Sequence, residues 1–258
     1  MKPFMAKLIS NEAEGPVMRK LVFQADEAFE QEVCPGQFAH LKVPGATAHL
    51  LRRPISIMDA DKAAKTLTLM IQPKGEGTQL ICALQAGDEL EMIAPLGHGF
   101  EPGDAAHIWA MGGGVGVAPM VYACKQFSKN AEVTSIMGYR TEKQIFSENI
   151  LSWVSRDLII CTDDGTVGVH GTVIDGAKTL EGKPDLIIAC GPTPMLKAVQ
   201  QFALENDIPC QLSLEQRMGC GYGACLTCSC KTKDADGHED HARVCADGPV
   251  FNAAEVVL

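Results

Sequence analysis

The sequence is poor in aromatic residues, in positive charge and in long apolar runs. Only 5% of its 258 residues are aromatic, and 22 lysines and arginines stand against 32 acidic residues, which gives a net charge of −10. This balance, with few basic clusters, disfavours nucleic acid or an anionic membrane as a partner. No stretch approaches about 18 uninterrupted apolar residues, and Met1 to Met5 lead into no apolar signal-peptide core. We therefore expect a cytoplasmic protein without a membrane span.

Cysteine, by contrast, is abundant. Eleven cysteines in an apparently unsecreted chain indicate reduced thiols and metal ligation rather than a disulfide framework. Cys82, Cys124, Cys161 and Cys190 have apolar neighbours that suit buried free thiols. Because 46% of the residues are hydrophobic, the chain can bury one large core or two to three small ones.

Four of the cysteines form the most informative motif. Cys220, Cys225 and Cys228 have C-x4-C-x2-C spacing and Cys245 follows, which is the plant-type arrangement of ligands around a [2Fe–2S] cluster. The intervening glycines let the backbone turn around inorganic sulfide and point N–H groups at it. The alternatives are a zinc knuckle, although zinc sites usually pair two short C-x2–4-C units, or a set of core cysteines. We interpret Cys230 as a bystander, because a C-x-C ligand pair is not part of the pattern.

The pattern of the chain changes twice, which predicts three modules. Residues 1–101 alternate short β-rich runs with Pro and Gly turns, as in a small antiparallel β-barrel. Residues 102–210 alternate strands with helical stretches, one of them through Gln144–Val154, which predicts a parallel sheet with helices on its faces. Residues 211–258 have little room for a core of their own, so we expect a bound metal to stabilise their fold. The predicted fold class is multi-domain β and α/β.

Two glycine-rich turns in the second module each follow an apolar strand and open a helix. Such turns at the carboxyl ends of strands form the crevice where open α/β sheets bind ligands, here a dinucleotide. The first is not the standard G-x-G-x-x-G fingerprint, because Val117 takes the sixth position, and tight packing is its alternative explanation. Arg140 either meets a 2′-phosphate or caps its strand. The candidate binding residues of the two turns are Gly112, Gly113, Gly114, Gly116, Cys190, Gly191 and Pro192.

The first module carries a candidate pyrophosphate clamp. Arg53, set by Pro54, can hold a phosphate bidentately, and the hydroxyl of Ser56 can bond a flavin or ribose edge. Gly77 and Thr78 then open a short helix that offers its amino end to a second phosphate oxygen. The alternative is a surface arginine pair at the start of a strand.

The order of these motifs along the chain resembles the ferredoxin-reductase superfamily. Within it, the stretches 51–57, 94–100, 213–218 and 243–251 closely resemble the electron-transfer subunit of bacterial class 1B, NAD-dependent dihydroorotate dehydrogenase. One departure is His98, where we expect asparagine. By resemblance the cluster ligands are the four cysteines named above. The implied FAD contacts are Arg53, Pro54, Ile55, Ser56, Met70, Ile71, Gln72, Gly77 and Thr78.

The resemblance also implies a function. In such enzymes a partner subunit carries FMN and oxidises dihydroorotate in pyrimidine biosynthesis, in an expected two-plus-two heterotetramer. The present chain would pass the electrons through [2Fe–2S] and FAD to NAD+. A flavin must stand between the other two carriers, because NADH exchanges two electrons at once and the cluster one. We find no constellation for proton abstraction from a substrate, so no residue is assigned as catalytic.

Two other functions fit parts of the sequence. A flavin and iron–sulfur NAD(P)H reductase subunit that serves ferredoxin or a hydrogenase-like partner would share the arginine and cysteine motifs. A cofactor-free scaffold with structural zinc would require all the glycine turns to be accidental. The sequence does not decide between NAD and NADP.

Overall fold

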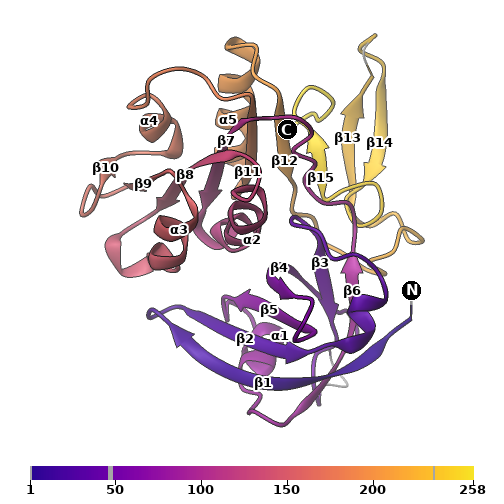
Figure 1. Cartoon of the computed structure of the whole chain (residues 1–258). Coiled ribbons are helices and arrows are strands. Elements are labelled where there is room, and N and C mark those ends of the chain that lie inside the picture. Colours follow the sequence, from indigo (N-terminus) through magenta and orange to yellow (C-terminus); the bar gives the residue numbers. More distant parts are fainter. Residues whose placement is uncertain (1, 46–48, 235) are drawn as a thin grey trace.

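The computed structural model describes residues 2–45, 49–234 and 236–258. Its strands form a closed six-stranded barrel, a seven-stranded sheet and a separate two-stranded hairpin (Figure 1). No helix in these ranges is long and apolar enough to cross a membrane. The predicted barrel, parallel-sheet domain and small C-terminal part are all present.

The barrel contains the N-terminal third of the chain. Leu67, Leu69 and Ile71 alternate along one strand and are fully buried in the barrel interior, whereas Met70 faces outward and packs against the second domain. A 3-10 turn, η1 (Asp26–Glu30), and a short helix, α1 (Glu76–Cys82), complete this part. In their order around the barrel, the strands are β1 (Phe4–Glu14), β2 (Met18–Gln24), β5 (Thr66–Ile71), β4 (Arg53–Asp61), β3 (Phe38–Leu41) and β6 (Glu89–Leu96).

The seven-stranded sheet is parallel except at one edge, where the last strand runs antiparallel to its neighbour. Alternate residues of its central strands point to opposite faces, as in a sheet covered on both sides. The strands, in spatial order, are β10 (Val169–His170), β9 (Asp157–Thr162), β8 (Glu132–Tyr139), β7 (His107–Gly113), β11 (Leu186–Cys190), β12 (Cys210–Ser213) and β15 (Val250–Asn252).

Helices cover both faces of this sheet. One face packs against α2 (Val117–Phe127) and α3 (Glu148–Val154), and the other against α4 (Val173–Ala177) and α5 (Thr193–Glu205). Helix α2 follows directly on the first glycine turn, whose last residues form a 3-10 turn, η2 (Gly114–Gly116). The amino end of α2 therefore lies at the carboxyl edge of the sheet.

The C-terminal part shares its core with the other two. The hairpin of β13 (Ser229–Lys233) and β14 (Glu239–Arg243) stands beside the sheet, and β15 adds an edge strand to it (Figure 1). Cys228 and Cys245 are buried in the same cluster as Phe38 of the barrel and Leu196 of α5. This agrees with the expectation that the segment cannot build a core alone.

One helix begins later than its pattern suggested. The prediction of a helix through Gln144–Val154 is wrong at its start, because η3 (Glu142–Gln144) is a separate 3-10 turn and α3 begins at Glu148. Ser147 interrupts the run with a left-handed φ of 57°. Phe146 just before it is buried edge-to-face against Tyr139, so tertiary packing decides the break.

Candidate functional site

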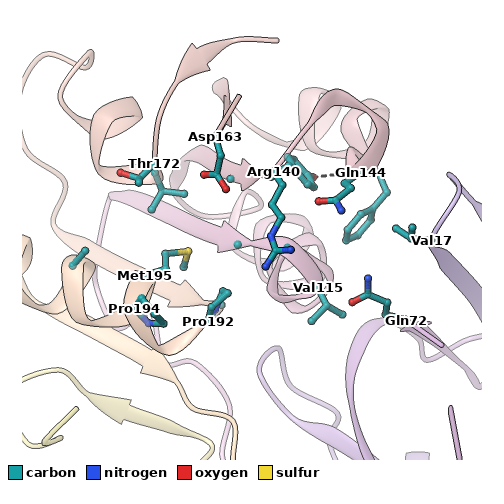
Figure 2. A pocket seen from close by; sticks show the side chains of 18 of the residues that line it. Val17, Gln72, Val115, Arg140, Gln144, Asp163, Thr172, Pro192, Pro194 and Met195 are labelled. Atoms are coloured by element: carbon teal, nitrogen blue, oxygen red, sulfur yellow. Dashed lines mark hydrogen bonds between the residues drawn. The ribbon is translucent and has the colours of Figure 1, made fainter. Parts of the chain in front are cut away.

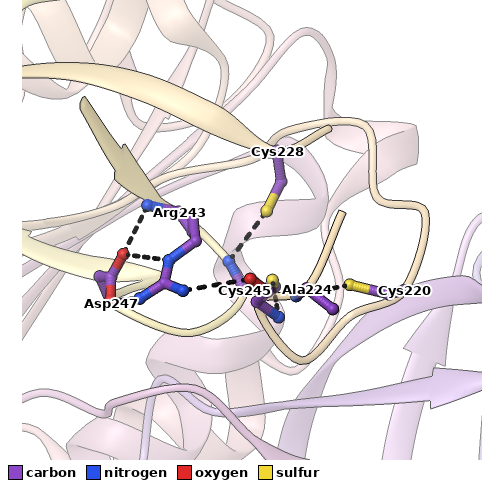
Figure 3. Close-up of polar contacts among 7 residues, drawn as sticks. Cys220, Ala224, Cys228, Arg243, Cys245 and Asp247 are labelled. Atoms are coloured by element: carbon purple, nitrogen blue, oxygen red, sulfur yellow. Dashed lines mark hydrogen bonds and ion pairs between the residues drawn. The ribbon is translucent and has the colours of Figure 1, made fainter. Parts of the chain in front are cut away.

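The four predicted ligands lie in and beside one loop whose backbone N–H groups point at sulfur, and Figure 3 shows Cys220, Cys228 and Cys245 among them. The N–H of Gly223 donates to Cys245 Sγ at 3.1 Å, and that of Ala224 to Cys220 Sγ at 3.3 Å. The N–H groups of Cys220 and Cys245 donate to Cys225 Sγ and Cys228 Sγ, each at 3.4 Å. Every one of the four sulfurs thus accepts an amide hydrogen bond, the environment that thiolates around an iron–sulfur cluster use.

The sulfurs fall into two pairs, an arrangement that favours a cluster site over a zinc site. The side chains of Cys220 and Cys225 contact each other, as do those of Cys228 and Cys245. Within the described residues, no three of these thiols bring their sulfurs within 4.8 Å of one another. A single tetrahedral zinc needs all its sulfurs about 3.8 Å apart, given a Zn–S bond of about 2.3 Å. Two pairs instead fit the two irons of [2Fe–2S].

One end of this site faces solvent. Cys225 is exposed, and a hydrogen bond with the Thr227 side chain, helped by the Cys220 N–H, lowers the pKa of its thiol to about 6. Cys228 and Cys245 are buried. Cys230 lies on β13, where its sulfur meets the backbone N–H groups of Cys230 itself and of Ala242 rather than those of the cysteine loop.

A cavity of about 280 Å³ between the barrel and the sheet brings most of the predicted flavin residues together. It is lined by Pro54, Ile55, Ser56, Met70, Gln72 and Thr78. Ile71 does not line it, because its side chain is in the barrel core, which leaves only its backbone to face a ligand. The cavity is also lined by Val115 of η2, Ala118 of α2 and Met218, which lies just before the cysteine loop.

Arg53 and Gly77 lie against each other beside this cavity. A Cβ on Gly77 would come within 2.8 Å of Arg53 Nε and Nη2, so only glycine lets the guanidinium lie over the first turn of α1. The Nη1 of Arg53 donates to the Leu51 carbonyl at 2.6 Å, and the remaining N–H groups are free of partners in the described structure. The pair forms the kind of cradle that a phosphate would fill.

A larger cavity, of about 640 Å³, opens at the carboxyl edge of the sheet (Figure 2). Gly113 and Gly114 line it from the first glycine turn, and Gly191 and Pro192 from the second. Gly114 has φ +55°, and a Cβ at this position would meet no described atom within 4 Å, so its open side is available to a ligand. Arg140 also lines the cavity and extends its guanidinium into the open space of Figure 2.

The other three residues of these turns pack the turns together. A Cβ on Gly116 would lie 2.3 Å from the Cys190 carbonyl oxygen, and one on Gly112 would lie 2.7 Å from Met137 Sδ. Gly112, Gly116 and Cys190 do not line the cavity. Cys190 is buried, and burial raises the pKa of its thiol to about 12. The first glycine turn therefore has both features: some of its glycines allow tight packing, and others leave an open edge to which a ligand can bind.

The two cavities share a wall, so their ligands would meet. Gln72, Lys74, Val115 and Glu215 line both of them. Hydride exchange between a nicotinamide and a flavin requires this contact, because the reacting atoms must come within about 3–3.5 Å. The shared wall places the two predicted cofactor sites next to each other.

Lys74 and Glu215 have no role that local sequence pattern predicts. Lys74 only precedes the glycine–threonine helix start, and Glu215 appears only within the stretch 213–218. Asp163 and Thr172, at the far wall of the larger cavity in Figure 2, are also absent from the predicted site. Asp163 could have been found from the sequence, because it follows an apolar strand directly. The backbone N–H of His98 donates to the Gly248 carbonyl at 2.6 Å.

Comparisons with known proteins agree with this arrangement. Residues 215–257 match the family model of the iron–sulfur cluster binding domain of dihydroorotate dehydrogenase B. The chain is 41% identical over 230 residues to the dihydroorotate dehydrogenase B (NAD(+)) electron transfer subunit of Bacillus velezensis, with 87% of each chain covered. The same subunit of Bacillus pumilus is 35% identical over 267 aligned positions, covering 100% of this chain and 99% of the relative.

Solved structures share the fold at lower identity. An NADH-dependent reduced ferredoxin-NADP oxidoreductase structure superposes with a TM-score of 0.86 at 23% identity, covering 98% of this chain and 89% of that one. A cytochrome P450 reductase from Amycolatopsis gives a TM-score of 0.67 over 79% of this chain and 66% of the other. These likenesses establish a ferredoxin-reductase fold. The sequence relatives go further: the chain belongs to the family of the electron transfer subunit of NAD(+)-dependent dihydroorotate dehydrogenase B.

Proposed function

We propose that this chain carries electrons from the FMN of a dihydroorotate-oxidising partner subunit to NAD+. When bound, [2Fe–2S] exchanges single electrons, and FAD converts pairs of them into a hydride for the nicotinamide. The observation that carries the proposal is the continuity of the cavities, with Gln72, Lys74, Val115 and Glu215 common to both. Met218 extends the wall of the smaller cavity to within two residues of the first cluster cysteine.

We assign the residues of this chain as follows. Residues 1–101 bind FAD, residues 102–210 bind NAD, and residues 211–258 hold the cluster. Arg53 and Thr78 bind the FAD pyrophosphate, and the barrel residues Pro54, Ile55, Ser56, Met70, Ile71, Gln72 and Gly77 surround the rest of the cofactor. Gly113, Gly114, Gly191 and Pro192 contact the dinucleotide, while Gly112, Gly116 and Cys190 hold the two turns in register. The ligands of the cluster are Cys220, Cys225, Cys228 and Cys245.

The exposed edge of the cysteine loop is the proposed docking site for the FMN subunit. Tyr222 and Leu226 are 60% and 63% exposed on either side of Cys225, and large apolar side chains so exposed are typical of interaction surfaces. Docking there would bring the partner's FMN to the solvent-facing end of the cluster. The assembly proposed is a two-plus-two heterotetramer in the cytoplasm.

The test is coexpression with an FMN-containing dihydroorotate dehydrogenase subunit. We expect copurification, flavin and [2Fe–2S] absorption, and reduction of NAD+ by dihydroorotate only when both chains are present. Leu226→Asp should lower this transfer at least tenfold, while NADH oxidation with an artificial acceptor that takes electrons from FAD stays within twofold.

Trp153→Asp provides the matched control. Trp153 is 87% exposed on α3, which Figure 1 places on the other side of the molecule from the hairpin β13–β14. Its replacement should leave transfer unchanged. Copurification with a ferredoxin or hydrogenase-like partner instead, without activity toward dihydroorotate, would favour the alternative reductase function.

A further inference from the structure

His40 is a buried histidine whose ring lacks good hydrogen bonds. Its side chain is 0% exposed, and in the described structure neither Nδ1 nor Nε2 makes a hydrogen bond of good geometry. Buried polar groups are nearly always paired, because an unpaired one loses its bonds to water without replacement. An exception of this kind needs a functional or structural reason.

The alternation of β3 shows where this ring points. Ala39 and Leu41 belong to the barrel core, whereas Phe38 belongs to the core that contains Cys228 and Cys245. His40 lies on the same side of the strand as Phe38, because residues two apart share a face. It therefore faces out of the barrel toward the cysteine loop. Directly opposite it on β4 is Pro54, one of the proposed flavin contacts.

The loop is built around this imidazole. Gly221 has φ +81°, and a Cβ there would lie 2.3 Å from His40 Nδ1 and 2.9 Å from Cε1, so only a residue without a side chain lets the loop approach the ring this closely. The backbone groups of Cys220 and Arg52 also face the ring.

We propose that His40 is a positioning residue that sets the packing of the cluster loop on the flavin-binding strand β4, and thereby the rate of electron transfer between the two sites. This inference rests on the proposed function. Each transfer moves one electron, which oxidises one centre and reduces the other by one unit, and two transfers match the electron pair of one NADH. His40 is the cross-strand neighbour of Pro54 on β4, and its ring packs against Gly221, which follows the first ligand in the loop.

His40→Leu tests the proposal, because leucine keeps most of the volume and removes the ring. We expect NADH-driven reduction of the cluster, followed by stopped-flow absorption, to slow at least tenfold, and the EPR spectrum of the reduced cluster to change. FAD content, iron content and NADH oxidation through an artificial acceptor at FAD should stay within twofold. Leu41→Ala is the control, since it opens a cavity in the barrel core from the same strand and should lower thermal stability without changing the EPR spectrum.

A double-mutant cycle tests the direct contact. Gly221→Ala alone should collide with the ring and disturb the cluster EPR spectrum, and the combination with His40→Ala should be less disturbed than Gly221→Ala alone. If His40→Leu does not fold, this cycle decides the question. Additive effects in the cycle, or unchanged reduction rate and EPR spectrum in folded His40→Leu, would overturn the proposal. Absence of NADH-driven cluster reduction in the unaltered chain would instead refute the proposed function.

Discussion

Arg243 and Asp247 form a two-pronged ion pair beside the cysteine loop. Arg243 Nε donates to Asp247 Oδ2 at 2.8 Å and Nη2 to Oδ1 at 2.7 Å, while the Arg243 backbone N–H also donates to Oδ2 at 2.8 Å (Figure 3). The remaining guanidinium nitrogen, Nη1, donates to the Gly223 carbonyl at 3.1 Å. Since the N–H of Gly223 donates to Cys245 Sγ, the pair holds both a peptide of the loop and a positive charge next to the fourth ligand.

Replacing Arg243 should therefore make the cluster harder to reduce. Reduction adds negative charge, which a nearby guanidinium stabilises, so Arg243→Gln should lower the reduction potential. A tenfold change in the equilibrium corresponds to about 59 mV for one electron, and we expect a shift of this order. EPR-monitored redox titration measures it. Lys231→Gln is the control, because Lys231 makes only an exposed 3.8 Å pair with Glu239 in the same hairpin. An equal shift in both variants would contradict a specific role of Arg243.

Arg53→Ala should weaken flavin retention. The change removes the guanidinium that lies over Gly77, and a hydrogen bond to a charged group contributes about 1.5–3 kcal/mol. Iron content should persist, because the cysteine loop does not depend on this side chain. The flavin-to-protein ratio after extensive dialysis is the measurement. Equal ratios in the variant and the parent would show that Arg53 does not bind the phosphate.

Sequence motifs were sufficient to predict those features of the molecule that a single short segment forms. The spacing of Cys220, Cys225 and Cys228, and the open turn at Gly114, can be recognised within a few residues. The joint wall of the two cavities could not be predicted in this way, because Lys74 and Glu215 are more than a hundred residues apart and meet only through the fold. The same applies to β15, which returns from the end of the chain to pair with β12.

Gly114→Val should impair the use of NADH while the visible cofactors remain. A β-branched residue at φ +55° is strained, and its side chain would enter the open space of the larger cavity. Gly103→Val is a matched control, because Gly103 has φ +54°, also has nothing within 4 Å, and does not line the cavity. We expect the NADH oxidation rate at full flavin occupancy to fall at least tenfold only in Gly114→Val. Similar losses in both variants would point to backbone strain rather than to the binding site.

Cys225→Ser and Cys230→Ser separate a ligand from its neighbour. Cys225 Sγ accepts the Cys220 N–H and pairs with the Cys220 side chain, whereas Cys230 stands on β13 outside this set. Serine is a poor substitute for a thiolate, so Cys225→Ser should lose most of the iron and of the [2Fe–2S] spectrum. Cys230→Ser should keep both, along with most activity.

The two activities of these variants should then diverge. NADH oxidation with an artificial acceptor at FAD bypasses the cluster, so Cys225→Ser should retain much of it. Transfer from the proposed FMN partner to NAD+ should collapse in Cys225→Ser and persist in Cys230→Ser. Circular dichroism checks that the fold survives loss of the cluster. Cluster loss in Cys230→Ser with retention in Cys225→Ser would refute the ligand assignment. Undiminished partner-to-NAD+ transfer in a chain without iron would refute the electron route itself, because the proposed route has no other one-electron carrier between FMN and FAD.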